Sequence, residues 1–578
     1  MNNARPNQAE QAQIRTVWVI GVIATIAIVG GAIALGLGGV GPSPSTAPSK
    51  AFASAATTAV SQTKVPGTPT PTSSALPTPT SSALPTPTSS TAPTGTPSPE
   101  ALAAIAIVPV ADFRSTADSI IAADVSKVLA GSGGRWKTLE LVASQTDAVL
   151  GSIGVARSTV GARLIEAPDA KTLMADLATH RDRLAFMRAD EVGPGVRALG
   201  WNGLSLFGTH RLKVLAEWKL AATLPAEVVG TPATTFVPYD PATTWTMFVA
   251  GDLGFDRMVA YVVKDLKKGV DYPYDGGTAK IVGTVCCSAF GWRLPTIVST
   301  GHRGAMRDLI SSADLALANM EEPTPDRWVY HPHGTVFTGD PALLAGVARA
   351  GIDVVSCAST HIGDGGKVGI LQTVASLARY GIKAFGCGKN LAAARAPAVF
   401  ELGGTKVAIL GYDSISANYY GATATTIGSA PLTARSVKAD VAAARAAGAR
   451  VVIVYPHWGV EYEFGPSAYQ KQLGHLMIDA GADIVIGNHG HWVQSVEIYK
   501  GKPIWYGLGN FTFDQTWSEP TLEGVSLELT FRAGTLVQAR MNPHVLIQGV
   551  QPNLLDPATS GQRVLAPVFN ASGALLAW

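Results

Sequence analysis

The stretch Asp483-Ile-Val-Ile-Gly-Asn-His-Gly-His491 is a short apolar run that leads directly into a polar cluster with two histidines. Similar β-rich runs end in polar clusters elsewhere in the chain, at 247–250 before Asp252, 315–318 before Glu321, 353–357 before His361 and 450–455 before His457. Helix-like stretches separate several of them, at 341–350, 371–380 and 467–480. This alternation predicts an α/β fold with a largely parallel sheet flanked by helices. Ligands bind beyond the carboxyl ends of such strands, where these clusters fall.

The residue types in these clusters predict a metal site. The chain has 11 histidines, and four of them follow the predicted strands: His361, His457, His489 and His491. With Asp252 and Glu321 they form a mixed imidazole and carboxylate set, which suits Mn, Zn or Fe rather than Ca. A single histidine at a strand end is more often packed or hydrogen-bonded than metal-bound. The His-x-His pair together with the other clusters is harder to obtain by chance, and it provides enough ligands for two ions.

Several motifs in the same order resemble a known family. They include Gly251-Asp252, Asn319-Met-Glu321, His457-Trp-Gly-Val-Glu461, His489-Gly-His491 and Gly507-Leu-Gly-Asn510. On these motifs, residues 245 to about 515 resemble the CapA family of capsule-biosynthesis and poly-γ-glutamate synthesis proteins. The resemblance implies a metallophosphatase-like α/β sandwich.

The resemblance also implies two divalent ions, with Mn, Zn and Fe as candidates. It assigns Asp252 and His491 to one ion, His457 and His489 to the other, and Glu321 to both as a bridge.

Three further residues receive roles from the resemblance. His361 would act as a general acid toward the leaving-group oxygen, and Arg257 would contact an anionic substrate. Where the family usually has Asn-Asn-His, this chain has Ser359-Thr360-His361, so Thr360 is a possible degenerate metal ligand. Its hydroxyl is a shorter and weaker donor than an amide oxygen. Occupancy of the second metal site is therefore expected to be lower than that of the first.

Residues 1–100 predict a membrane anchor and a spacer. Residues 17–40 carry no charge and are long enough to cross a bilayer, which takes about 20 apolar residues. A cleaved signal peptide is the alternative, with small-residue patterns at 51–53 and 53–55. Arg5 and Arg15 favour a cytoplasmic segment over residues 1–16 and an extracytoplasmic remainder. Residues 41–100 are rich in Pro, Thr and Ser and predict a disordered linker.

Two folded domains are expected after this linker. Residues 101–229 predict a small α/β domain that weakly resembles a solute-binding lobe, and a spacing or polymer-contacting domain is the alternative. Residues 230–244 predict a second linker, and residues 245–578 the CapA-like domain. Alternating runs at 525–531 and 536–540 predict antiparallel strands that complete the second sheet of the sandwich. The adjacent Cys286 and Cys287 are poorly placed to bond to each other.

Composition excludes two protein classes. A formal charge of +2 over 578 residues argues against a nucleic-acid-binding protein, which normally has a strongly basic face. Four cysteines in a chain of this length exclude a disulfide scaffold.

The sequence therefore predicts a membrane-anchored extracytoplasmic hydrolase or transferase with a two-metal site. The resemblance places it in the synthesis, release or attachment of capsule or poly-γ-glutamate. Its expected partners are the anionic surface polymer or its precursor, the membrane, and other subunits of a polymer-synthesis complex. The alternative is a non-catalytic polymer-binding or assembly subunit in which Thr360 marks a degenerate site.

Overall fold

A computed structural model describes residues 102–225, 238–576 and 578, all of which belong to one compact unit. The predicted cytoplasmic segment, membrane anchor and disordered linker lie outside the described residues, as does most of the predicted second linker. Among the helices that the structure describes, none has the length and apolar character needed to cross a bilayer.

Residues 238–578 are built on two large sheets. The first has the order β11-β10-β26-β25-β24-β9-β12-β13-β14, with β23 beside β9. Its strands are β9 (Thr244–Leu253), β10 (Thr278–Val285), β11 (Leu294–Gly301), β12 (Leu315–Met320), β13 (Val354–Ser356), β14 (Lys383–Phe385), β23 (Asn510–Thr512), β24 (Glu523–Arg532), β25 (Thr535–Ile547) and β26 (Gln551–Leu555).

The second sheet has the order β16-β17-β19-β20-β22-β21. Its strands are β16 (Ala398–Leu402), β17 (Thr405–Asp413), β19 (Val451–His457), β20 (Ile484–Ile486), β21 (Val496–Tyr499) and β22 (Lys502–Trp505). The runs β9-β12-β13-β14 and β17-β19-β20-β22 are parallel. The prediction of parallel, helix-flanked strands is therefore confirmed for these central runs, whereas the remaining pairings include several antiparallel ones.

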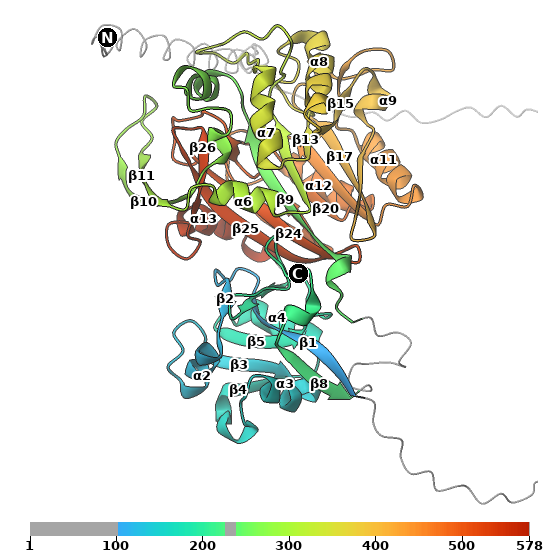
Figure 1. The fold of residues 1–578 in the computed structure, drawn as a ribbon. Helices are drawn as coiled ribbons and strands as arrows, with labels where there is room; N and C mark the ends of the chain where they lie inside the picture. Colours follow the sequence, from blue (N-terminus) through green and yellow to red (C-terminus); the bar gives the residue numbers. More distant parts are fainter. Residues whose placement is uncertain (1–101, 226–237, 577) are drawn as a thin grey trace, which may run out of the picture. The chain divides into compact units, whose positions relative to one another are not determined.

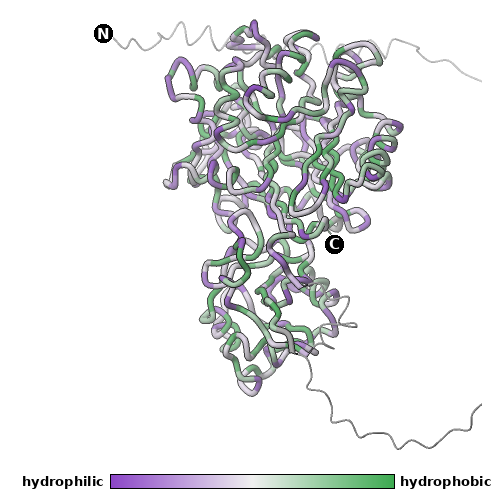
Figure 2. Tube along the Cα trace, turned by 45° about the vertical axis from the view of Figure 1, so that its right-hand side comes forward, coloured by the Kyte–Doolittle hydropathy of each residue, from purple (hydrophilic) through white to green (hydrophobic). Residues whose placement is uncertain are grey.

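The two sheets and their helices form four layers (Figure 1). Because strand side chains alternate, Met247 and Val249 face the core between the sheets, whereas Phe248 packs on the helical side. The first sheet is covered by α6 (Ala305–Ser311), α7 (Leu344–Ala350) and α8 (Gly366–Arg379), and the second by α11 (Ala434–Ala446) and α12 (Ala468–Asp479). Figure 2 shows hydrophobic segments along the central strands and hydrophilic ones in many of the outer loops.

Smaller elements complete this region. They are α5 (Arg257–Ala260), α9 (Leu391–Ala394), α10 (Ala417–Tyr420), α13 (Gln562–Ser572) and the two-stranded pair of β15 (Cys387–Gly388) and β18 (Gly428–Ser429).

The structure joins Cys286 and Cys287, between β10 and β11, in a disulfide. The expectation that these neighbours would not bond to each other was therefore wrong.

The C-terminal strands occupy a different place from the predicted one. β24 and β25 are antiparallel, as expected, but they extend the first sheet and do not complete the second. β24 pairs with β9 from Trp245 opposite Phe531 to Val249 opposite Leu527, and the rings of Trp245 and Phe531 stack at 4.1 Å. This pairing satisfies the backbone groups on the edge of β9 that faces away from β12.

Residues 102–225 form a smaller α/β region. Its main sheet has the order β4-β3-β5-β1-β6, with β8 also paired to β1. Its core is built almost wholly from its own side chains, and hydrogen bonds link it to the first sheet, for example from Ala198 N to Gln538 Oε1 at 2.8 Å. Its elements are β1 (Leu102–Asp112), β2 (Ser119–Ile120), α2 (Ala122–Ala130), β3 (Thr138–Val142), α3 (Thr146–Ser152), β4 (Leu164–Ala167), α4 (Ala170–Thr179), β5 (Arg183–Arg188), β6 (Val196–Ala198), β7 (Gly200–Trp201) and β8 (Ala221–Pro225).

Candidate metal centre

The predicted ligands lie where strands of the two sheets end. Asp252 is near the end of β9, Glu321 directly follows β12, and His457 is the last residue of β19. His489 and His491 lie in the loop after β20. All five side chains are buried. The parallel register of the central strands therefore carries polar residues that are distant in sequence to the same edge of the sandwich.

Two buried carboxylates share one amide at this edge. The strand register places Asn319 beside Asp252, and the Asn319 Nδ2 donates to Asp252 Oδ1 at 2.8 Å and to Glu321 Oε2 at 2.7 Å. Burial and the nearby Asp252 raise the pKa of Glu321 well above its usual range. A cation beside these two buried carboxylates would stabilise their charged forms.

Glu321, His457 and His489 form a group whose ligand atoms all lie within 4.8 Å of one another. Burial is the main cause that lowers the pKa values of both His457 and His489 well below the usual range, which favours neutral imidazoles. Within the part of the chain that the structure describes, Glu321 Oε1, both ring nitrogens of His457 and His489 Nδ1 lack hydrogen-bond partners. Unpaired buried polar atoms are costly, so this group fits a divalent cation.

His491 is oriented by its neighbours. Its Nδ1 lies 2.9 Å from Asn510 Oδ1 and 3.3 Å from Asp252 Oδ2. Because both oxygens accept, Nδ1 carries the proton and Nε2 keeps a lone pair in the neutral ring, as is typical of a metal-binding histidine. Burial alone would lower the pKa of His491, but Asp252 and Asn510 outweigh it and raise that pKa.

The loop that carries the two histidines has an unusual backbone. His489 and His491 have φ values of 89° and 55°, in the left-handed region that side chains other than glycine rarely adopt. Gly487 precedes them because a Cβ there would lie 2.1 Å from Trp458 Nε1 and 2.3 Å from the Tyr506 carbonyl oxygen. This backbone conformation places both imidazoles among the carboxylates.

His361 and Thr360 lie in a loop that is tied to Glu321. The Ser359 hydroxyl donates to the Glu321 carbonyl oxygen at 2.7 Å. The Nδ1 of His361 lies 2.9 Å from Asp364 Oδ2, and the His361 ring contacts Phe337 at 4.5 Å. Thr360 is partly buried and follows Ser359 directly. The electrostatic influence of His361 reaches His457, since it contributes to the lowered pKa of that residue.

The structure places Arg257 in a buried ion pair. Its guanidinium is buried, forms an ion pair with Asp514, and lies 4.4 Å from the Phe337 ring centroid and 5.5 Å from that of Phe513.

The structure adds polar residues that the sequence did not single out as ligands. Asn319 and Asn510 connect the carboxylates and His491. The Asn488 side chain is buried, and its two amide atoms lack hydrogen-bond partners among the described residues. Glu461 Oε1 lies 3.9 Å from His489 Nε2. The one signal for Asn488 in the sequence is its position between a buried strand and the two histidines.

Comparisons with known proteins agree with these motifs. Residues 246–515 match a family model described as "Bacterial capsule synthesis protein PGA_cap". The PGA biosynthesis protein CapA of Bacillus subtilis is 34% identical over 166 residues, which are 28% of this chain and 43% of that protein. A probable polyglutamine synthesis accessory protein of Mycobacterium tuberculosis is 33% identical over 236 residues, 39% of this chain and 60% of that protein. The chain thus spans about half the length of these relatives.

Solved structures show weaker likeness. A 5'-nucleotidase precursor from Thermus thermophilus is 16% identical, with a TM-score of 0.32 over 57% of this chain and 58% of that chain. The calcineurin-like phosphoesterase YfkN from Bacillus subtilis is 13% identical, with a TM-score of 0.29 over 57% of this chain and 99% of that chain. TM-scores this low support no argument about activity. The family match, by contrast, confirms the resemblance that the motifs indicate: residues 246–515 of this chain are similar to the bacterial capsule synthesis PGA_cap family.

Proposed function

We propose that this chain acts in the synthesis of capsule or poly-γ-glutamate through a divalent-metal centre of the hydrolase type. The observation that carries the proposal is the buried group of Glu321, His457 and His489, whose unpaired atoms fit a divalent cation. The family match supports the biological setting, since its relatives are named for capsule and PGA biosynthesis.

In this proposal the five residues at the strand ends hold the metal. Asp252 and His491 serve one ion, His457 and His489 serve a second, and Glu321 lies between them. When bound, such ions polarise a phosphoryl or acyl group and lower the pKa of bound water. The neutral imidazoles favoured by burial are the form that binds metal.

His361 is proposed to move a proton. The Asp364 carboxylate accepts from the Nδ1 proton and stabilises the charged ring, so that Nε2 can donate to a leaving-group oxygen. The Phe337 edge limits rotation of the ring. We assign Arg257 a positioning role, since its pair with Asp514 connects α5 to the segment after β23.

The protein is further proposed to be anchored by residues 17–40, with residues 1–16 in the cytoplasm and the remainder outside. Residues 41–100 would then separate the folded region from the membrane. Other subunits of a polymer-synthesis complex are its proposed partners.

One observation favours a second function. Thr360 stands where the family usually provides an amide ligand, so the second ion would be held less tightly. A chain in which this site has decayed would act as a non-catalytic polymer-binding or assembly subunit.

Metal content and hydrolysis separate these two functions. The full-length chain, purified in detergent, is supplied with Mn, Zn or Fe, and bound metal and phosphodiester hydrolysis are measured. Asp252→Ala and His491→Ala are expected to lose both metal and hydrolysis. His210→Ala, which changes a histidine whose side chain is 59% exposed, is expected to keep both. No bound metal and no hydrolysis, in either the wild type or Thr360→Asn, would overturn the catalytic proposal. Metal binding without hydrolysis would favour the assembly subunit.

A further inference from the structure

A cleft lined by arginines lies away from the candidate metal centre. It begins at the carboxyl end of β1 and is closed on its other side by β25 and α13. Two adjoining hollows share Arg114, Ser115, Thr116 and Phe569, and together they are called the arginine cleft. The proposed metal ligands do not line either hollow.

Positive charge exceeds negative charge in this cleft. Its lining contains five arginines and one carboxylate, Asp112; the arginines are Arg114, Arg135, Arg181, Arg197 and Arg540. Asp112 pairs with Arg114 at 2.9 Å and Arg181 at 3.5 Å.

Two carboxylates that do not line the cleft, Asp118 and Glu528, interact electrostatically with lining arginines. Asp118 pairs with Arg197 at 2.9 Å and Arg540 at 2.6 Å, and Glu528 acts on Arg197 from a buried position. Arg135 has no carboxylate partner among the residues that the structure describes. Among the described residues, four of these five guanidinium groups share two carboxylates, Asp112 and Asp118, in ion pairs.

Arg197 is the buried end of this arrangement. Its side chain is 7% exposed, and burial, together with the nearby Arg540, lowers its pKa to about 9. A charged guanidinium buried beside another one is unfavourable unless anions compensate it. An oxyanion in the cleft would stabilise the charged form of Arg197.

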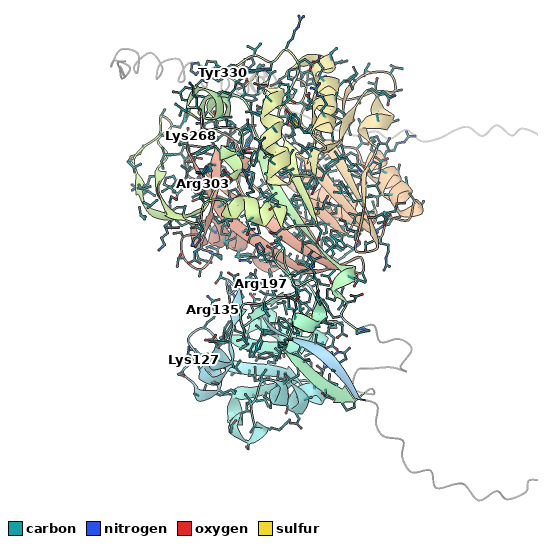
Figure 3. All side chains as sticks on the ribbon, in the orientation of Figure 1. Lys127, Arg135, Arg197, Lys268, Arg303 and Tyr330 are labelled. Atoms are coloured by element: carbon teal, nitrogen blue, oxygen red, sulfur yellow. A yellow bond between two sulfur atoms is a disulfide. The ribbon has the colours of Figure 1, made fainter. Side chains whose placement is uncertain are left out.

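The rest of the lining suits an elongated anion. Ser115 and Thr116 line both hollows, and hydroxyl groups, like arginines, can donate to carboxylate oxygens. Phe569 and Trp578 provide apolar surface for methylene groups. The arginines come from separate segments of the chain, and Figure 3 shows Arg135 and Arg197 at different places on the smaller region. A spread of guanidinium groups fits repeated carboxylates better than a single ion.

We propose that this cleft binds a polycarboxylate chain such as a γ-linked glutamate oligomer. The choice of polymer rests on the proposed function, whereas the location of the site does not. The cleft would hold the polymer without a metal ion and independently of any hydrolysis.

Binding of a fluorescent γ-linked glutamate decamer to the full-length chain tests this site. The measurement is made in EDTA, so that metal cannot contribute. The double substitution Arg135→Glu and Arg181→Glu changes two exposed lining residues and is expected to weaken binding at least about tenfold, which corresponds to about 1.4 kcal/mol. The matched control, Lys127→Glu with Lys171→Glu, reverses the same amount of charge on exposed residues outside the cleft. It is expected to change binding less than twofold.

Three outcomes would overturn the assignment. They are no binding of the decamer to the wild type, equal weakening in both double variants, and equal displacement of the fluorescent decamer by inorganic phosphate and by unlabelled decamer at the same concentration. The Asp252→Ala variant separates this test from the proposed function, because its metal centre is changed and its cleft is not. Wild-type binding by that variant supports a separate polymer site even if hydrolysis is never detected.

Discussion

The candidate metal centre and the arginine cleft differ in the charge of the ligand that each would bind. The centre would bind a cation, and the cleft would bind an anion. In the centre, Asp252 and Glu321 are buried, and burial lowers the pKa values of His457 and His489, so the proposed ligand is a cation. In the cleft, arginines outnumber carboxylates in the lining, so the proposed ligand is an anion. The proposed metal ligands are buried, whereas Arg135 and Arg181 of the cleft are exposed. Substitutions near the centre should therefore affect stability and metal binding, and substitutions at the exposed cleft residues should affect binding alone.

The largest expected effect on stability comes from the buried ion pair beside the centre. Arg257→Ala leaves Asp514 buried without its partner and is expected to lower the free energy of unfolding by about 3–5 kcal/mol. Arg303→Ala is the control, because its side chain is 80% exposed and pairs with Asp275 at 3.3 Å. Its cost is expected to stay below about 1 kcal/mol. Urea unfolding of both full-length variants measures the difference, and equal costs would contradict the structural role of Arg257.

The packing behind the centre should depend on pH. Burial lowers the pKa of His544 to about 4, and its Nε2 lies 3.0 Å from the Asn510 carbonyl oxygen. Between pH 6.5 and 4 the unfolded chain binds a proton at this residue while the folded chain does not, so stability falls as the pH falls. The loss over this window is roughly 3 kcal/mol, at about 1.36 kcal/mol for each pKa unit.

His544→Gln tests this dependence. The variant is expected to lose less stability than the wild type between pH 7 and pH 4, measured by urea unfolding at a series of pH values. Identical pH slopes in the wild type and the variant would show that His544 is not responsible.

Thr360→Asn should have a smaller effect, confined to metal binding. An amide oxygen at this position is expected to tighten the second ion about tenfold, or about 1.4 kcal/mol. Titration of the metal-free protein measures the two affinities separately. An unchanged second affinity would show that Thr360 does not limit the site.

The smallest effect is expected in the cleft. Arg135 is exposed, and its contact is with the Trp136 ring at 5.7 Å, so Arg135→Ala should change stability by less than about 0.5 kcal/mol. Thermal unfolding of the full-length variant checks this. A large destabilisation would mean that Arg135 supports the fold and is not available to a ligand.

The sequence predicted the parts of the centre that follow from strand patterning. Runs such as 247–250 and 315–318 each lead into a polar residue, and parallel pairing aligns their ends. The sheets and the helices that cover them follow from the alternation of strand-like and helix-like stretches along the sequence. These features are local or depend on a simple packing rule.

Features that depend on distant contacts were not predictable. The pairing of Arg257 with Asp514 joins residues far apart in the chain. The position of β24 beside β9 depends on which sheet edge is available. The arginine cleft gathers residues from Arg114 to Arg540, and no single stretch of sequence marks it.

The amount of metal bound by Glu321→Gln tests most directly whether the cluster of Glu321, His457 and His489 is a metal centre. This substitution preserves the shape of the side chain and removes the charge between the two proposed ion sites. Glu401→Gln, at an exposed position of β16, is the matched control. The account predicts bound divalent metal in the wild type and the control, and affinity at least about 100-fold weaker in Glu321→Gln. Equal metal content in all three proteins, measured after dialysis by mass spectrometry, would contradict the assignment of this cluster as a metal centre.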